Sequence, residues 1–97
     1  MPIYILATKL QNPNLVKNRK EHGEKYLKLV NEKVPTVKWI AHYAILGPYD
    51  FIDIFEADNE YEAAKVSLLS RTAGAAFAES WTAIKYAEFL KLVEDLE

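Results

Sequence analysis

Apolar and polar residues recur along this chain with two periods, one of about two residues and one of about 3.6 residues. The first period is typical of strands and the second of helices. The pattern predicts strands over 3–10, 37–46, 51–57 and 76–84, and helices over 12–32, 59–74 and 86–96. The chain is therefore expected to run strand, helix, strand, strand, helix, strand, helix.

Residues with known preferences for helix ends support the two longer helices. Asn12 is suited to cap the first helix and Pro13 to occupy its first turn. Pro35 ends that helix, because the residue before a proline is pushed out of the helical region. Asn59 is expected to cap the second helix and Gly74 to end it.

The segment Gly47-Pro48-Tyr49-Asp50 lies between two strand-like runs and predicts a tight reversal. A four-residue loop would place Leu46 opposite Phe51. In that register His42 and Asp53 are diagonal neighbours on one face of the sheet. The other face then carries Trp39, Tyr43 and Glu56.

This order of elements predicts an α+β fold, the ferredoxin-like βαββαβ arrangement with a four-stranded antiparallel sheet and an added C-terminal helix. Residues 1–97 are expected to form one domain. Both faces of the sheet are largely apolar, although the helices cover only one of them. A small protein rarely leaves such a face exposed, so we expect the second face to be buried against another subunit.

Composition narrows the classes of function. Apolar residues make up 51% of the chain, charged residues 27%, and the net charge is -2, which argues against disorder and against a basic nucleic-acid-binding surface. The absence of cysteine removes disulfides and thiolate chemistry, and makes a cytoplasmic location the default expectation. No run approaches the length of a membrane span, and the start shows no leader, so we expect a soluble, unprocessed protein.

The run Tyr43-Ala44-Ile45-Leu46-Gly47-Pro48-Tyr49-Asp50-Phe51-Ile52, followed by Glu56-Ala57, resembles the signature of the GYD-domain family. The similarity extends from Pro2-Ile3-Tyr4-Ile5 to Trp81-Thr82-Ala83-Ile84 and Glu88-Phe89-Leu90. The resemblance implies a dimeric α/β-barrel type of assembly and a family of unknown function. A similar turn occurs in the ligand-sensing domain of Lrp/AsnC-type regulators. Gly47, Tyr49 and Asp50 carry the motif, and we interpret them as structural.

Three side chains are candidates for proton transfer. His42 and Asp53 are less typical of the family and can form a pair in which the carboxylate orients an imidazole as a general base. The alternative is a polar contact at a subunit interface. Glu56, expected beside Trp39 and Tyr43, can have a raised pKa against aromatic rings, or can lie in solvent at the end of its strand.

Four aromatic residues, Tyr4, Trp39, Tyr43 and Trp81, are candidates for lining a small-molecule cavity, although aromatics at strand spacing are often plain core. The two histidines, His22 and His42, are separated by a helix and a strand, so no metal site is expected. No cofactor motif and no phosphate-binding glycine loop is found.

Three hypotheses of function follow. The first is a homo-oligomeric small-molecule-binding, accessory or regulatory protein. The second is a cofactor-independent enzyme that transfers a proton on a small organic substrate. The third is a stand-alone ligand-sensing domain that resembles those of Lrp/AsnC regulators. The expected partners are further copies of the chain and a small molecule, joined by DNA-binding proteins under the third hypothesis, with no direct contact of this chain to nucleic acid or membrane.

Overall fold

The structure is a computed structural model in which residues 1–11 and 18–97 are described. Over these residues, the strands are β1 (Ile3–Leu10), β2 (Lys38–Ala44), β3 (Phe51–Glu56) and β4 (Ala75–Ala83), and the helices are α1 (Arg19–Lys33), α2 (Glu60–Thr72) and α3 (Tyr86–Leu96). The strands form one antiparallel sheet in the order β2-β3-β1-β4. The predicted α+β ferredoxin-like class is confirmed.

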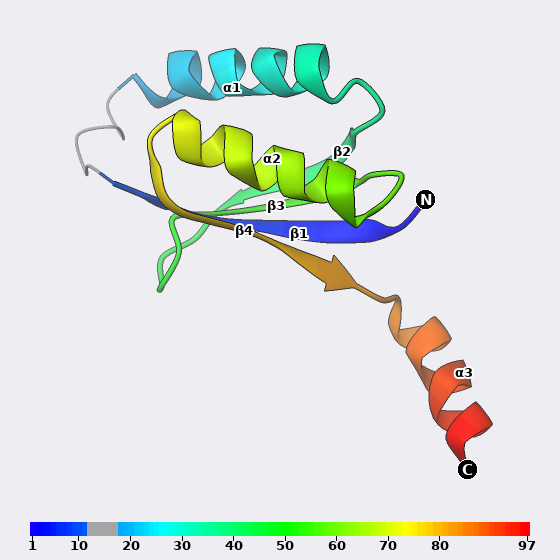
Figure 1. Ribbon diagram of the computed structural model, residues 1–97. Coiled ribbons are helices and arrows are strands. Elements are labelled where there is room, and N and C mark those ends of the chain that lie inside the picture. The colour runs from blue at the N-terminus through cyan, green and yellow to red at the C-terminus, as the bar shows by residue number, and fades with distance from the viewer. Residues whose placement is uncertain (12–17) are drawn as a thin grey trace.

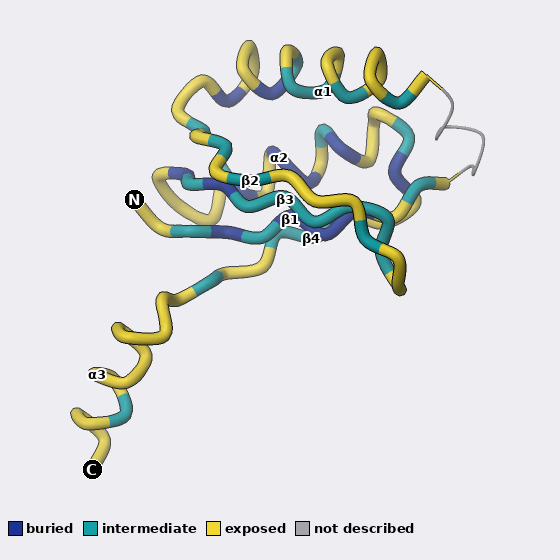
Figure 2. Tube along the Cα trace, turned by 180° about the vertical axis from the view of Figure 1, so that it is seen from behind, coloured by how far each residue is buried: buried dark blue, intermediate teal, exposed yellow. Residues whose placement is uncertain are grey.

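Helices α1 and α2 cover one face of the sheet, whereas α3 continues outward from the end of β4 (Figure 1). No helix within residues 1–11 and 18–97 covers the other face of the sheet, here called the open face. Buried residues gather between the sheet and its two covering helices, and α3 has no buried residue (Figure 2). The molecule is therefore a two-layer body with a projecting arm.

The core lies between the two covering helices, α1 and α2, and the central strands. Its largest fully buried side chains are Phe55, Leu6, Val30, Val34 and Val66. Phe55 stacks on Tyr4 of the neighbouring strand, with 5.6 Å between ring centroids. Burial of a side chain of this size contributes about 1.5–3 kcal/mol to stability, so this cluster holds α1 and α2 on the sheet.

The helix ends agree in part with the sequence. The predicted start at Asn12 and Pro13 lies outside the described residues, and α1 begins at Arg19, after Asn18 with its positive φ of 59°. The cap of α2 is confirmed, because Asn59 Oδ1 accepts the Glu62 backbone N–H at 3.0 Å. Gly74 follows this helix with φ 106°, a conformation that glycine adopts without strain.

The predicted hairpin register is wrong by two residues. Ala44 lies opposite Phe51, so a six-residue connection replaces the expected four-residue loop, and Leu46 is fully exposed instead of paired. The physical reason is Asp50, which bonds to β1 while its carbonyl accepts the Ile45 N–H at 2.8 Å and closes the longer connection. Its backbone N–H donates to the Thr8 carbonyl at 2.8 Å, and its carboxylate accepts the Leu10 N–H at 2.7 Å.

An irregularity in β2 corrects a second prediction. Trp39 lies opposite Phe55 and Ala41 opposite Ile54, which leaves Ile40 as an extra residue in β2. Such a β-bulge reverses the alternation of side chains on the residues before it. Trp39 therefore shares the helix-covered face with His42, and its expected position on the face of Tyr43 is wrong.

Candidate functional site

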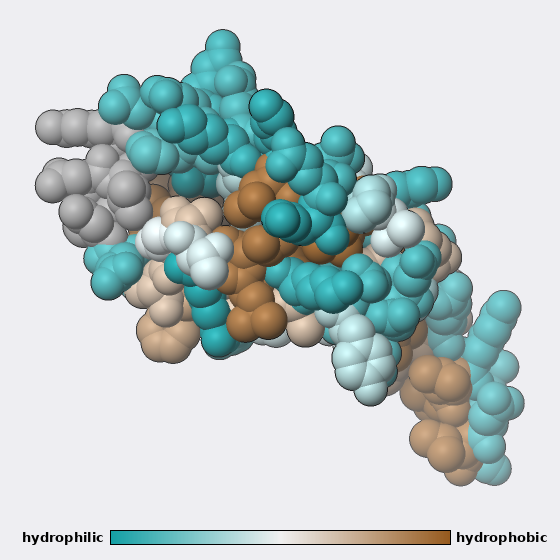
Figure 3. All heavy atoms as spheres, turned by 45° about the horizontal axis from the view of Figure 1, so that its top comes forward, coloured by the Kyte–Doolittle hydropathy of each residue, from teal (hydrophilic) through white to brown (hydrophobic). Residues whose placement is uncertain are grey.

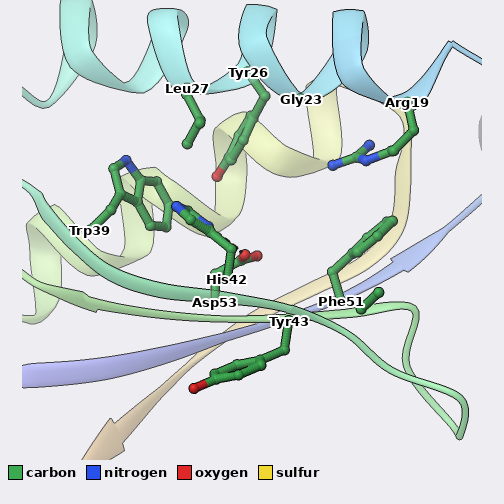
Figure 4. Close-up of a pocket in the computed structure, with 10 residues that line it drawn as sticks. Arg19, Gly23, Tyr26, Leu27, Trp39, His42, Tyr43, Phe51 and Asp53 are labelled. Atoms are coloured by element: carbon green, nitrogen blue, oxygen red, sulfur yellow. Dashed lines mark hydrogen bonds and ion pairs between the residues drawn. The ribbon is translucent and has the colours of Figure 1, made fainter.

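A hollow of about 270 Å³ lies between α1 and the β2–β3 hairpin (Figure 4). Its volume is close to the lower limit for pockets that hold small organic molecules. We call it the α1 pocket. Its lining includes Arg19, Gly23, Tyr26 and Leu27 from α1, and Trp39, His42, Phe51 and Asp53 from the strands.

His42 and Asp53 form the polar centre of the α1 pocket. They are directly opposite each other in the β2–β3 ladder, and His42 Nδ1 lies 2.8 Å from Asp53 Oδ1. With Nδ1 donating to the carboxylate, Nε2 is the ring nitrogen that remains to exchange a proton or bind a ligand. The sequence predicted that the two residues are diagonal neighbours on one face of the sheet. In the observed register they share that face, lie directly opposite each other and are hydrogen-bonded.

The carboxyl group of Asp53 is mostly buried, with 17% of its side chain exposed, whereas the His42 ring is 46% exposed. Burial raises the pKa of Asp53 above its ordinary value, while the hydrogen bond and charge of His42 and the charge of Arg19 act in the opposite direction. The burial effect is the largest of these. The pair therefore combines a desolvated acid with an imidazole that solvent and ligands can reach.

Aromatic rings form the wall beside this pair. The Trp39 ring lies 5.2 Å from the His42 ring and 6.3 Å from the Tyr26 ring, measured between centroids. Tyr26 is fixed because its hydroxyl donates to the Val66 carbonyl of α2 at 2.8 Å. Burial, followed by the nearby Asp53 charge, raises the pKa of Tyr26, so its hydroxyl stays protonated. The wall is thus rigid, apolar and edged with hydroxyl and imidazole groups.

A cation lies at the far end of the α1 pocket. The Arg19 guanidinium is positioned over the Phe51 ring, 4.2 Å from its centroid, in a cation–π arrangement. Between Arg19 and Tyr26 the helix has Gly23, where an added Cβ would come no nearer to another residue than 3.9 Å, to Arg19 Nη2. Because Gly23 has no side chain, the wall of the pocket that α1 forms stays open at this position.

The structure brings only some of the candidate residues to this pocket. Trp39, His42, Tyr43 and Asp53 line it, although the Tyr43 ring itself lies on the opposite side of the sheet (Figure 4). Tyr4 is buried in the core. Trp81 lies beyond the pocket on β4, where its ring meets Tyr49 at 5.5 Å and its Nε1–H donates to Glu79.

Glu56 is separate from the pair. It lies opposite Lys38 in β2 and Ile3 in β1 on the open face, so its expected position beside Trp39 is wrong. The cause is the bulge at Ile40, which changes the pairing at this end of β2. Glu56 lines a different hollow, near Lys85 and Glu88 at the base of α3.

Arg19, Tyr26 and Phe51 are pocket residues that the sequence did not single out. Arg19 and Tyr26 are seven residues apart, so the helical period puts them on one side of the first helix, and this is the signal that the sequence offers for them. Their proximity to His42 depends on how α1 crosses the sheet. Neither the helical period nor the spacing of residues along the chain predicts how α1 crosses the sheet.

Within residues 1–11 and 18–97, no group of three or more His, Asp or Glu side chains is arranged to hold a metal ion. In the same part of the chain no helix has both the length and the apolar character needed to cross a membrane. The chemistry that the described residues offer at the α1 pocket is hydrogen bonding, charge and aromatic contact.

Comparison with known proteins identifies the family. The GYD domain family model matches residues 4–93, and the chain belongs to this family. A relative from Thermus thermophilus, named glutamine synthetase and cystathionine beta-lyase binding protein, is 30% identical over 96 residues. That alignment covers 93% of this chain and 96% of the relative.

A solved structure has the same fold. The crystal structure of FFRP-DM1 matches with a TM-score of 0.55 and 20% sequence identity, covering 87% of this chain and all of that chain. At this identity the likeness concerns the arrangement of strands and helices.

Proposed function

We propose that this protein is a homo-oligomeric accessory protein, which binds metabolic enzymes and takes up a small organic molecule in the α1 pocket. The observation that carries the proposal is the pocket itself, where the bonded His42–Asp53 pair meets an aromatic wall. Two further findings support it: the near full-length relative is named for binding two enzymes, and the sheet of this chain has an uncovered apolar face.

The lining of the pocket indicates the class of small molecule. Trp39, Tyr26 and Phe51 suit a flat apolar body, because rings stack or meet edge to face. The Arg19 guanidinium suits an anionic group at one end of that body. We therefore expect a small aromatic or unsaturated carboxylate to bind in preference to its amine counterpart.

Benzoate, benzyl alcohol and benzylamine test this preference, because they share one ring and differ in charge. Titration followed by protein NMR should show the Trp39 indole and His42 resonances shifting most with benzoate. Gly23→Leu, which adds a large side chain on the α1 side of the pocket, should weaken this binding at least tenfold. Tyr61→Ala, at an exposed position on α2, should leave it unchanged. Equal shifts with all three compounds, or none with any, would contradict the proposed class.

The enzyme-binding part of the proposal has its own experiment. Purified Thermus thermophilus glutamine synthetase and cystathionine β-lyase are immobilised in turn and titrated with this protein, using biolayer interferometry. Saturable micromolar or tighter binding to either enzyme supports an accessory role. If neither enzyme binds, with or without benzoate, the proposed binding of enzymes is wrong. The proposed binding of a small molecule in the α1 pocket is then judged by the NMR titration alone.

A second candidate function is cofactor-independent proton transfer, which the His42–Asp53 geometry favours. Asp53 holds the imidazole through Nδ1, so Nε2 can take a proton from carbon next to a carbonyl group and return it to the same molecule. Phenylpyruvate in D₂O is a suitable probe, since exchange of its methylene protons is visible by NMR. His42→Gln should lower exchange to the rate measured without protein if the pair is catalytic, and an unchanged rate in that variant would exclude this role.

A further inference from the structure

Helix α3 exposes a continuous apolar side. Its large apolar side chains with solvent exposure between 43% and 88% are Tyr86, Phe89, Leu90, Leu92 and Leu96. Lys91 and Asp95 lie on the other side of the helix. Figure 3 shows the same division, with hydrophobic residues gathered along one side of the projecting helix and hydrophilic residues along the other.

An isolated helix of this length is not stable in water. Helices shorter than about 12–15 residues are marginal without tertiary packing, and α3 has 11 residues, no buried residue and no side-chain cap. Among the described residues no ion pair involves this helix. Its apolar side therefore needs a surface to pack against.

The open face of the sheet is the second uncovered apolar surface of the same chain. It carries Tyr43, Phe77 and Trp81, which are 55%, 57% and 39% exposed, and between them the half-buried Ile52 and Ile54. In Figure 1, α3 lies on this side of the sheet but continues past the end of β4, away from its own open face. Both surfaces are thus unpaired in a single copy.

The exposed area supports a partner of substantial size. The chain exposes 6851 Å², whereas a compact monomer of 11.1 kDa exposes about 5,700 Å². The difference of about 1,200 Å² exceeds the ~800 Å² that each partner contributes to a typical stable interface. The radius of gyration of 14.7 Å is also larger than the value of about 12.5 Å for a compact chain of this length.

We propose that α3 is an exchanged arm, whose apolar side packs on the open sheet face of a second copy. Every copy carries one arm and one acceptor face, so a two-fold arrangement covers both pairs of surfaces at once. This inference rests on the proposed homo-oligomer and adds the surfaces that build it.

Cysteine cross-linking tests the arm directly, because the natural chain contains no cysteine. Phe89→Cys protein is mixed with Tyr43→Cys or Phe77→Cys protein and oxidised, and mixed disulfides are identified by mass spectrometry. Lys91→Cys, on the opposite side of α3, is the matched control. We expect at least tenfold more mixed disulfide with Phe89→Cys than with Lys91→Cys.

A second pair of variants tests the energetic role of the arm. Phe89→Asp should weaken self-association at least tenfold, measured by light scattering across a dilution series. Lys91→Asp should leave it unchanged. Both positions lie outside the core, so circular dichroism should show that both variants keep the sheet and the two covering helices.

The outcomes separate the arm from the oligomer. A wild-type oligomer without mixed disulfides, or one that Phe89→Asp leaves intact, overturns the exchanged arm and keeps the homo-oligomer. A wild-type monomer overturns both. An intramolecular disulfide in a diluted Phe89→Cys/Tyr43→Cys double variant would show that α3 folds onto its own sheet, which also overturns the exchange.

Discussion

Asp53 illustrates how one buried carboxyl group links pH to stability in this fold. Its pKa is raised in the folded protein, so the folded state binds more protons than the unfolded state between the ordinary value near 3.8 and the raised value. Stability therefore falls as pH rises through that window. Above the window Asp53 is ionised in both states, and the whole loss of stability is present.

The Asp53→Asn variant should reveal this linkage, since the amide mimics the neutral acid. We expect its free energy of unfolding, relative to wild type, to improve as pH is raised from 3 to 7. Urea denaturation at several pH values measures the difference. In a protein that keeps Asp53, the His42→Ala substitution should enlarge the loss of stability with rising pH, because the imidazole that lowers the Asp53 pKa is gone. A pH-independent difference for Asp53→Asn would contradict the raised pKa.

Asp50 connects the hairpin to the central strand. Its carboxylate accepts the Leu10 N–H at 2.7 Å, a contact between residues 40 positions apart. A hydrogen bond to a charged group is worth about 1.5–3 kcal/mol when buried, and partial exposure lowers this, so Asp50→Ala should cost about 1 kcal/mol. Urea denaturation should show this loss, with Asp58→Ala, an exposed loop carboxylate, as the matched control.

The β2 strand shows that one inserted residue can decide which side chains form a site. The bulge at Ile40 turns Trp39 toward α1, where it packs against Tyr26 and His42. Without it, strand alternation would place Trp39 on the open face with Tyr43. The α1 pocket therefore depends on a local irregularity of β2 as much as on the helices above it.

The cap of α2 offers a test of helix stability. Asn59 Oδ1 accepts the Glu62 N–H at 3.0 Å, so Asn59→Ala should destabilise the protein by about 1 kcal/mol. For a domain of this size that corresponds to a melting temperature lower by about 4–8 °C. Differential scanning calorimetry measures the shift. Asn59→Asp preserves the acceptor and should stay within about 2 °C of wild type, whereas equal losses in both variants would show that the cap is not the cause.

The molecule as a whole has more apolar surface than two covering helices can bury, because its sheet keeps one face open and its last helix projects. If copies associate through these surfaces, the melting temperature depends on protein concentration. A tenfold rise in concentration adds about 1.4 kcal/mol of stability per dimer, so scans from 5 to 500 μM, roughly two such steps, should show a clear increase. A melting temperature that is independent of concentration would indicate a monomer.

Local sequence patterns were sufficient for the elements and their order. Periodicity located the strands and helices, Asn59 and Gly74 marked the ends of α2, and the order of elements gave the ferredoxin-like class. Alternation also placed His42 and Asp53 on one face. These features depend on residues close together along the chain, where propensities and capping act.

The α1 pocket and the hairpin register depended on distant contacts instead. Asp50 bonds to β1 and so lengthens the connection, and the bulge at Ile40 brings Trp39 beneath α1. Arg19 and Tyr26 reach His42 only through the way α1 crosses the sheet. The amino-acid sequence by itself determined the elements, their order and the shared face of His42 and Asp53. Only the tertiary structure decided that these two residues bond beneath an aromatic wall, because that outcome depends on hydrogen bonds and packing between segments far apart in the chain.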